Sequence, residues 1–172
     1  LYPFMFVLPD GRILQAGASE EATITQALDI TTQSWTVVDP SVDDGGSAAM
    51  YLPGKIIKSG TATDPGRGSS PSACSTYVLD MSQVSPAWRQ TPPMAFPRSY
   101  HNLVLLPDGN VLVTGGGRTI DGVDVTQAVH EAEIWSSLTE TWTTVAAMQV
   151  PRLYHSTALL LPDGRVLVSG AG

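Results

Sequence analysis

Residues 106–115 read LPDGNVLVTG, and this stretch belongs to a series of four related segments. The other three read LPDGRILQAG at 8–17, LPGKIIKSG at 52–60 and LPDGRVLVSG at 161–170. A tryptophan follows each of the first three segments, at Trp35, Trp88 and Trp142. Repetition at intervals of about 40–50 residues is typical of architectures in which each repeat is one supersecondary unit.

Each segment predicts a hairpin turn between two strands. Proline fixes φ, and the Asp-Gly pair supplies the left-handed position that a tight turn requires. The runs 101–106 and 110–114 are therefore expected to be antiparallel strands. A third run at 132–135 and a fourth that begins at Trp142 complete a four-stranded unit. Helices are not expected, because Pro, Gly, Thr and Val interrupt every run with a 3.6-residue period.

These units predict an all-β protein, an incomplete kelch-type β-propeller with about three four-stranded blades and half of a fourth. The predicted units cover roughly 1–46, 47–97, 98–150 and 151–172. A β-sandwich is the alternative, although the repeated order of Pro-Asp-Gly, Gly-Gly and Trp favours blades. Because blades bury their faces against neighbours, we expect further chain or a second copy to cover the open ends.

The composition excludes several classes of partner. There are 9 Lys and Arg residues against 16 Asp and Glu, a formal charge of −7, so nucleic acid is not an expected partner. No apolar run approaches the roughly 18 residues of a membrane helix, so no membrane is expected either. The single cysteine, Cys74, excludes an internal disulfide framework and a zinc-finger pattern. The presence of two lysines among abundant Ser and Thr favours an extracellular or cell-surface location.

Two Tyr-His pairs stand just before predicted hairpins, in PRSYH at 97–101 and in PRLYH at 151–155. A phenol oxygen and an imidazole nitrogen are donors that suit Cu(II) or Fe(III). Neighbouring side chains of a strand point to opposite faces, so both can reach one metal only at the start of a strand, where each pair is expected. The alternative is that both pairs are packing and hydrogen-bonding devices. Arg98 and Arg152 are expected to pair with carboxylate or carbonyl groups of a neighbouring blade.

The string RLYHSTALLLPDGRV at 152–166 resembles the copper-site blade of the galactose oxidase and glyoxal oxidase family, the copper radical oxidases. Residues 98–116 are similar to the preceding blade of that family, and residues 4–17 to an earlier one. The family has a seven-bladed propeller followed by an immunoglobulin-like domain. The resemblance therefore implies that this chain is a piece of a larger protein.

The resemblance also implies a mononuclear copper that is held by two tyrosines and two histidines. Tyr154 would be the axial tyrosine ligand and the general base that accepts the substrate hydroxyl proton, and His155 would be an equatorial ligand. Tyr100 stands where the family has an aromatic side chain that faces substrate. The implied reaction oxidises a small alcohol, sugar or aldehyde with O₂ and releases H₂O₂. Copper supplies one redox equivalent, and a tyrosyl radical crosslinked to a cysteine supplies the other.

A part of that machinery is expected outside this chain. The radical tyrosine and its cysteine would lie upstream of Leu1 and the second histidine beyond Gly172, while Cys74 falls in the wrong blade. The family's pocket loops correspond to 61–72 and to the neighbourhood of Val123. In both places this sequence differs from the family, so it does not identify the substrate. The isolated chain is expected to be inactive. The alternatives are a kelch-repeat interaction scaffold and a family member that binds no metal.

Overall fold

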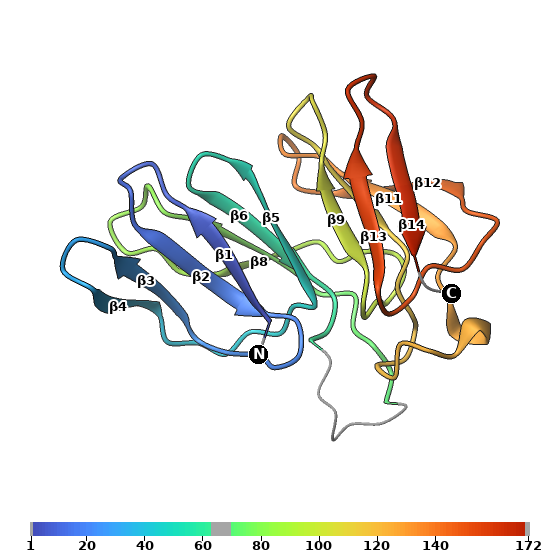
Figure 1. The fold of residues 1–172 in the computed structure, drawn as a ribbon, viewed down its shortest axis with the longest axis horizontal. Helices are drawn as coiled ribbons and strands as arrows, with labels where there is room; N and C mark the ends of the chain where they lie inside the picture. The colour runs from blue at the N-terminus through green and yellow to red at the C-terminus, as the bar shows by residue number, and fades with distance from the viewer. Residues whose placement is uncertain (1, 63–69, 171–172) are drawn as a thin grey trace.

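A computed structural model describes residues 2–62 and 70–170 and shows an all-β chain (Figure 1). The first sheet contains β1 (Pro3–Val7), β2 (Ile13–Ala18), β3 (Thr25–Asp29) and β4 (Ser34–Asp39). The second contains β5 (Ser47–Leu52), β6 (Lys55–Ser59), β7 (Thr76–Asp80) and β8 (Arg89–Thr91). The third contains β9 (Asn102–Leu105), β10 (Val111–Thr114), β11 (Glu131–Trp135) and β12 (Trp142–Ala147). The last sheet pairs β13 (Ser156–Leu160) with β14 (Val166–Gly170).

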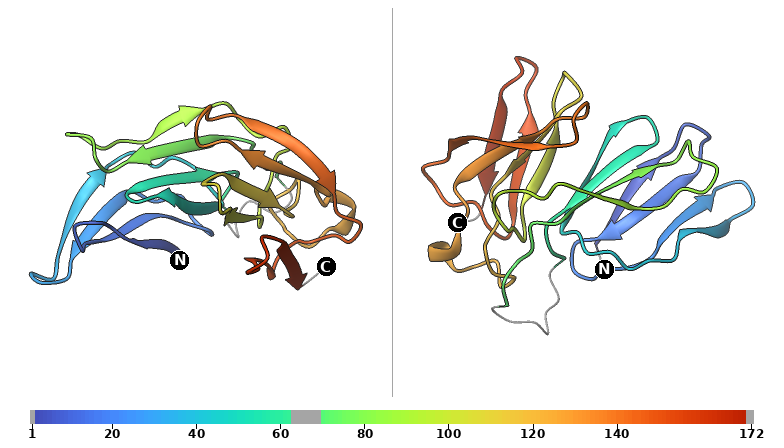
Figure 2. Two further views of the ribbon diagram at one scale, coloured as in Figure 1. Left: turned by 90° about the horizontal axis from the view of Figure 1, so that it is seen from above. Right: turned by 180° about the vertical axis from the view of Figure 1, so that it is seen from behind.

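The sheets are arranged as successive blades. Within each sheet the strands pair antiparallel in chain order. The first strands of neighbouring sheets contact one another, β1 with β5, β5 with β9 and β9 with β13. Seen from above, the sheets follow one another along an arc (Figure 2). This arrangement confirms the predicted all-β, kelch-type partial propeller with three four-stranded blades and half of a fourth.

The Pro-Asp-Gly segments form the hairpin turns that the sequence predicts. In three blades the aspartate Oδ1 accepts the backbone N–H two residues later, at 3.0 Å for Asp10, 3.0 Å for Asp108 and 3.1 Å for Asp163. The glycine after each aspartate has a φ of 87°, 81° or 83°, which favours glycine over residues that carry a Cβ. The repeated motif is thus a local requirement of the turn backbone.

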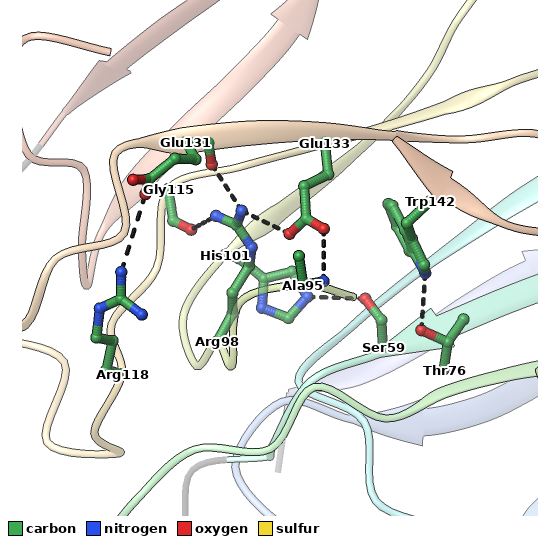
Figure 3. A network of polar contacts seen from close by, with 10 residues as sticks. All are labelled: Ser59, Thr76, Ala95, Arg98, His101, Gly115, Arg118, Glu131, Glu133 and Trp142. Carbon is green, nitrogen blue, oxygen red and sulfur yellow. Dashed lines mark hydrogen bonds and ion pairs between the residues drawn. The ribbon is translucent and has the colours of Figure 1, made fainter. Parts of the chain in front are cut away.

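Two of the repeated tryptophans, Trp88 and Trp142, join a blade to the one before it. The Trp88 indole Nε1–H donates to Thr25 Oγ1 at 2.7 Å, and the Trp142 Nε1–H donates to Thr76 Oγ1 at 3.0 Å (Figure 3). Both threonines are fully buried, so the hydroxyl groups depend on these bonds for a partner. Each of these tryptophans therefore gives a buried threonine of the preceding blade its hydrogen-bond partner.

A fully buried ion pair between Arg98 and Glu133 lies within the third blade (Figure 3). Arg98 Nη2 donates to Glu133 Oε2 at 2.9 Å and to the Glu131 carbonyl at 2.6 Å, while Nη1 donates to the Gly115 carbonyl at 2.7 Å. The other carboxylate oxygen of Glu133 accepts the Ala95 N–H at 2.7 Å. The pair thus ties the segment before β9 to the end of β10 and to β11.

The prediction that Arg98 and Arg152 pair with groups of a neighbouring blade is wrong. Arg98 does bind a carboxylate and carbonyls, but these belong to its own blade rather than to a neighbour. Arg152 repeats the arrangement in the fourth blade, where Nη1 donates to the Gly170 carbonyl at 2.7 Å. Each arginine stands just before the first strand of its sheet and bonds a glycine carbonyl at the end of the second strand, and Arg98 also bonds Glu131 and Glu133 of β11.

Within the described ranges, the one helical segment is the short 3₁₀ turn η1 (Val125–Gln127), which Asp124 caps through a bond to the Thr126 N–H. None of the described helical residues provides the length and hydrophobicity that a membrane-spanning helix needs.

Candidate functional site

A cavity of about 390 Å³ opens at the end of the blades where the innermost strands begin. All four sheets contribute to its walls. They supply Tyr2 and Phe4 from the start of β1, 46–47 from the start of β5, 100–102 from the start of β9 and 154–156 from the start of β13. Both Tyr-His pairs therefore lie at strand starts, and both line one pocket.

Tyr154 and His155 face the same pocket because the backbone between them is not that of a strand. His155 has a φ of 65°, in the left-handed region that few residues other than glycine adopt. The two rings stack with centroids 3.6 Å apart and an interplanar angle of 28°. Tyr154 is 39% exposed, and His155 is exposed as well. The turn at His155 thus removes the alternation that would otherwise point the two side chains apart.

The pair at Tyr100 and His101 is built differently. Here the first residue has the positive φ, 52° at Tyr100, and the histidine is 5% exposed. His101 Nε2 and Ser59 Oγ of the preceding blade are hydrogen bonded at 3.1 Å (Figure 3), and Nδ1 is buried without a partner. Burial, with a smaller contribution from the Arg98 cation, lowers the pKa of His101 from about 6.5 to about 3. His101 is therefore a neutral packing residue, in agreement with the alternative that this Tyr-His pair serves packing and hydrogen bonding.

This burial predicts a loss of stability in mild acid that depends on His101. The unfolded chain takes up a proton near pH 6.5 whereas the folded chain resists it down to about pH 3, so stability falls as the pH is lowered between these values. From pH 7 to pH 5 the contribution is roughly 2 kcal/mol. Urea unfolding at both pH values should show that His101→Gln reduces the drop by about this amount. An equal drop in the variant and the wild type would contradict the assignment.

Several contacts between the third and fourth blades hold the two pairs together. The Tyr100 ring packs edge-on against Tyr154, with centroids 5.0 Å apart and an angle of 69°. The Asn102 side-chain amide donates to Ser156 Oγ at 3.1 Å, and the Tyr154 N–H donates to the Gly122 carbonyl at 3.0 Å. The sequence alone assigned no role to Asn102, Ser156 or Gly122, although Asn102 and Ser156 lie in the two stretches that carry the family resemblance.

Tyr154 and His155 supply two donors of the kinds that copper takes. Their phenol oxygen and imidazole nitrogen are suitable donors, and the stacked, exposed rings present both to one cavity. Across residues 2–62 and 70–170, no cluster of three or more His, Cys, Asp or Glu side chains could hold a metal by itself. Two further donors would have to join this pair, because a copper centre takes about four ligands.

A family model described as the glyoxal oxidase N-terminus matches residues 54–172, which is more than half of the chain. The chain belongs to the glyoxal oxidase family. The resemblance expected from residues 152–166 and 98–116 is thereby confirmed, and the matched residues of this chain include both Tyr-His pairs.

Several relatives of this glyoxal oxidase family member carry oxidase names. A galactose oxidase of Gibberella zeae is 32% identical over 74% of this chain and 19% of its own length. The aldehyde oxidase GLOX of Vitis pseudoreticulata is 30% identical over 99% of this chain and 36% of its own length. A solved fungal alcohol oxidase of the AA5 family, in complex with copper, shares the fold with a TM-score of 0.71 at 19% identity, over 99% of this chain and 48% of its own. The chain thus spans about a fifth to a half of these proteins.

The two loops expected to shape the pocket remain predictions. Of the loop at 61–72, residues 63–69 lie outside the described residues. Val123 is 68% exposed and directly follows Gly122 in the loop between β10 and β11. Cys74 is partly buried and free, in the second blade and away from the residues that line the pocket.

Proposed function

We propose that this chain forms part of a copper-dependent oxidase that converts small primary alcohols, sugars or aldehydes with O₂ and releases H₂O₂. The observation that carries the proposal is the stacked Tyr154–His155 pair, which presents an oxygen and a nitrogen donor to one cavity. Family membership supports it, as do relatives that are named galactose oxidase and aldehyde oxidase. The proposed location is extracellular or at the cell surface.

The roles of the residues follow from their chemistry and placement. Tyr154 Oη and the His155 imidazole would hold copper, and Tyr154 Oη would also accept the hydroxyl proton of the substrate. Copper, together with a tyrosyl radical from outside this chain, would supply the redox chemistry of a two-electron oxidation. Tyr100 would form a wall against the substrate, because its ring packs on Tyr154 at the cavity edge.

The lining of the cavity supports a small organic substrate. Its walls are rich in aromatic rings, with Tyr2, Phe4 and Tyr100 beside the Tyr154–His155 pair. A tyrosine-rich wall can pack on a carbon chain or sugar ring and still hydrogen bond through its hydroxyl groups.

The proposal is tested by assaying peroxide release from the full-length protein that carries this chain, with and without added Cu(II). Primary alcohols, galactose and small aldehydes are the substrates. We expect copper-dependent peroxide from the full-length protein and none from the isolated 172-residue chain, which holds two of about four donors. The proposed activity would be overturned if the full-length protein bound copper but released no peroxide, or if it neither bound copper nor released peroxide. Absence of both would leave the kelch-repeat scaffold or the metal-free family member.

A further inference from the structure

The loop between β10 and β11 is fixed to the body of the protein. Its Gly117 N–H donates to the Ser99 carbonyl at 3.0 Å, and its Ile120 N–H donates to the Ser70 carbonyl at 3.0 Å. Ile120 is 3% exposed and Val129 is fully buried. Figure 1 shows this loop, with η1, at the end of the blades where β9 and β13 begin. The loop therefore holds a defined position beside the cavity.

Gly122 is the residue of this loop that contacts both tyrosines of the site. It is buried and has a φ of 66°. Its carbonyl accepts the Tyr154 N–H at 3.0 Å. On its other side it lies against the Tyr100 ring so closely that a Cβ at this position would come within 2.1 Å of Cδ2 and 2.2 Å of Cε2. One glycine thus touches the backbone of Tyr154 and the ring that packs against Tyr154.

We propose that Gly122 is a positioning residue that sets the direction of the Tyr154–His155 pair. The inference rests on the proposed function, in which that pair holds copper. A side chain at 122 would have to push the Tyr100 ring, which lies 5.0 Å from the Tyr154 ring, or displace the carbonyl that binds the Tyr154 N–H. Either movement turns the Tyr154 ring relative to His155, with which it now stacks at 3.6 Å.

The test compares Gly122→Ala with Gly109→Ala in the full-length protein. Gly109 also has a positive φ, 81°, and lies in the same blade, but a Cβ there would meet nothing closer than 3.7 Å. The control therefore imposes the same backbone penalty without the collision. We expect Gly122→Ala to weaken Cu(II) binding by about 10- to 100-fold, the range for residues that orient metal ligands, and Gly109→Ala to leave it within about twofold. Equal affinities in the two variants would overturn the proposal.

A second measurement is independent of copper. Hydrogen exchange at the Tyr154 amide reports directly on its bond to the Gly122 carbonyl. We expect this amide to be protected in the wild type and in Gly109→Ala, and to exchange on the order of tenfold faster in Gly122→Ala. An unprotected Tyr154 amide in the wild type would contradict the proposal even if Gly122→Ala failed to fold.

The coupling through Tyr100 is tested by adding Tyr100→Ala. Removal of the ring takes away the three atoms nearest to a Cβ at 122, so Gly122→Ala should lose less copper affinity and less amide protection in this background than in the wild type. Equal losses in both backgrounds would exclude the route through the ring. If the wild-type protein binds no copper, the proposed function fails, and the exchange measurements still decide whether Gly122 orders Tyr154.

Discussion

Replacing Glu133 by alanine is expected to destabilise the protein by about 3–5 kcal/mol, because it leaves the Arg98 cation buried without its carboxylate. Both side chains are fully buried, and their ion pair spans 2.9 Å. The variant also removes the acceptor of the Ala95 N–H. Urea unfolding of the full-length protein, followed by tryptophan fluorescence, gives the difference in the free energy of unfolding.

An exposed ion pair of the same composition provides the control. Arg89 and Glu140 lie 2.7 Å apart with side chains that are 61% and 30% exposed, so Glu140→Ala is expected to cost at most about 1 kcal/mol. Replacing both members of the buried pair by Arg98→Met and Glu133→Leu should be less harmful than Glu133→Ala alone. Similar losses for Glu133→Ala and Glu140→Ala would show that the buried pair is not what anchors the segment before β9.

The second large effect is expected at Tyr154. Exchanging it for phenylalanine in the full-length protein removes the Oη that would accept the substrate proton and bind copper, while the ring that stacks on His155 remains. A general base contributes about 100- to 10,000-fold to a rate, so kcat for peroxide release should fall at least by that factor. The free energy of unfolding should stay close to that of the wild type, because Tyr154 is 39% exposed.

The control for Tyr154→Phe is Tyr77→Phe. Tyr77 lies in β7, where its ring is 5.7 Å from the Lys58 ammonium and outside the cavity. This variant loses the same hydroxyl group and should keep the wild-type kcat. If Tyr154→Phe also kept its kcat, Tyr154 would be neither the base nor an essential ligand, and the pair would be a packing element.

The fold could be predicted from the sequence because its markers are local. A Pro-Asp-Gly turn requires particular φ values at consecutive residues, and these requirements are met within the turn itself, as the Asp108 bond to the Asn110 N–H illustrates. The tryptophans were equally informative markers of the repeat. The contact that explains their presence lies in the preceding blade, where the Trp142 Nε1–H donates to Thr76 Oγ1. Local turns and a regular period therefore sufficed for the architecture.

The site could be predicted in part. Two Tyr-His pairs with nearly identical flanks differ because long-range contacts place the positive φ at Tyr100 in one and at His155 in the other. His101 is buried against Ser59 of the preceding blade, and Gly122 lies against Tyr100 from a loop that carries no motif. No pattern within the pairs encodes these neighbours, so the sequence alone left the packing and ligand interpretations open for both.

Copper content measured on the purified full-length protein tests the central claim most directly. Wild type, His155→Ala and His130→Ala are loaded with Cu(II), desalted and analysed for metal. His130 is the control because it does not line the cavity; its Nδ1 is hydrogen bonded to the Met148 carbonyl at a distance of 2.9 Å. We predict about one copper per chain in the wild type and in His130→Ala, and a large loss in His155→Ala. Equal copper in the two histidine variants would contradict a metal centre at the Tyr154–His155 pair.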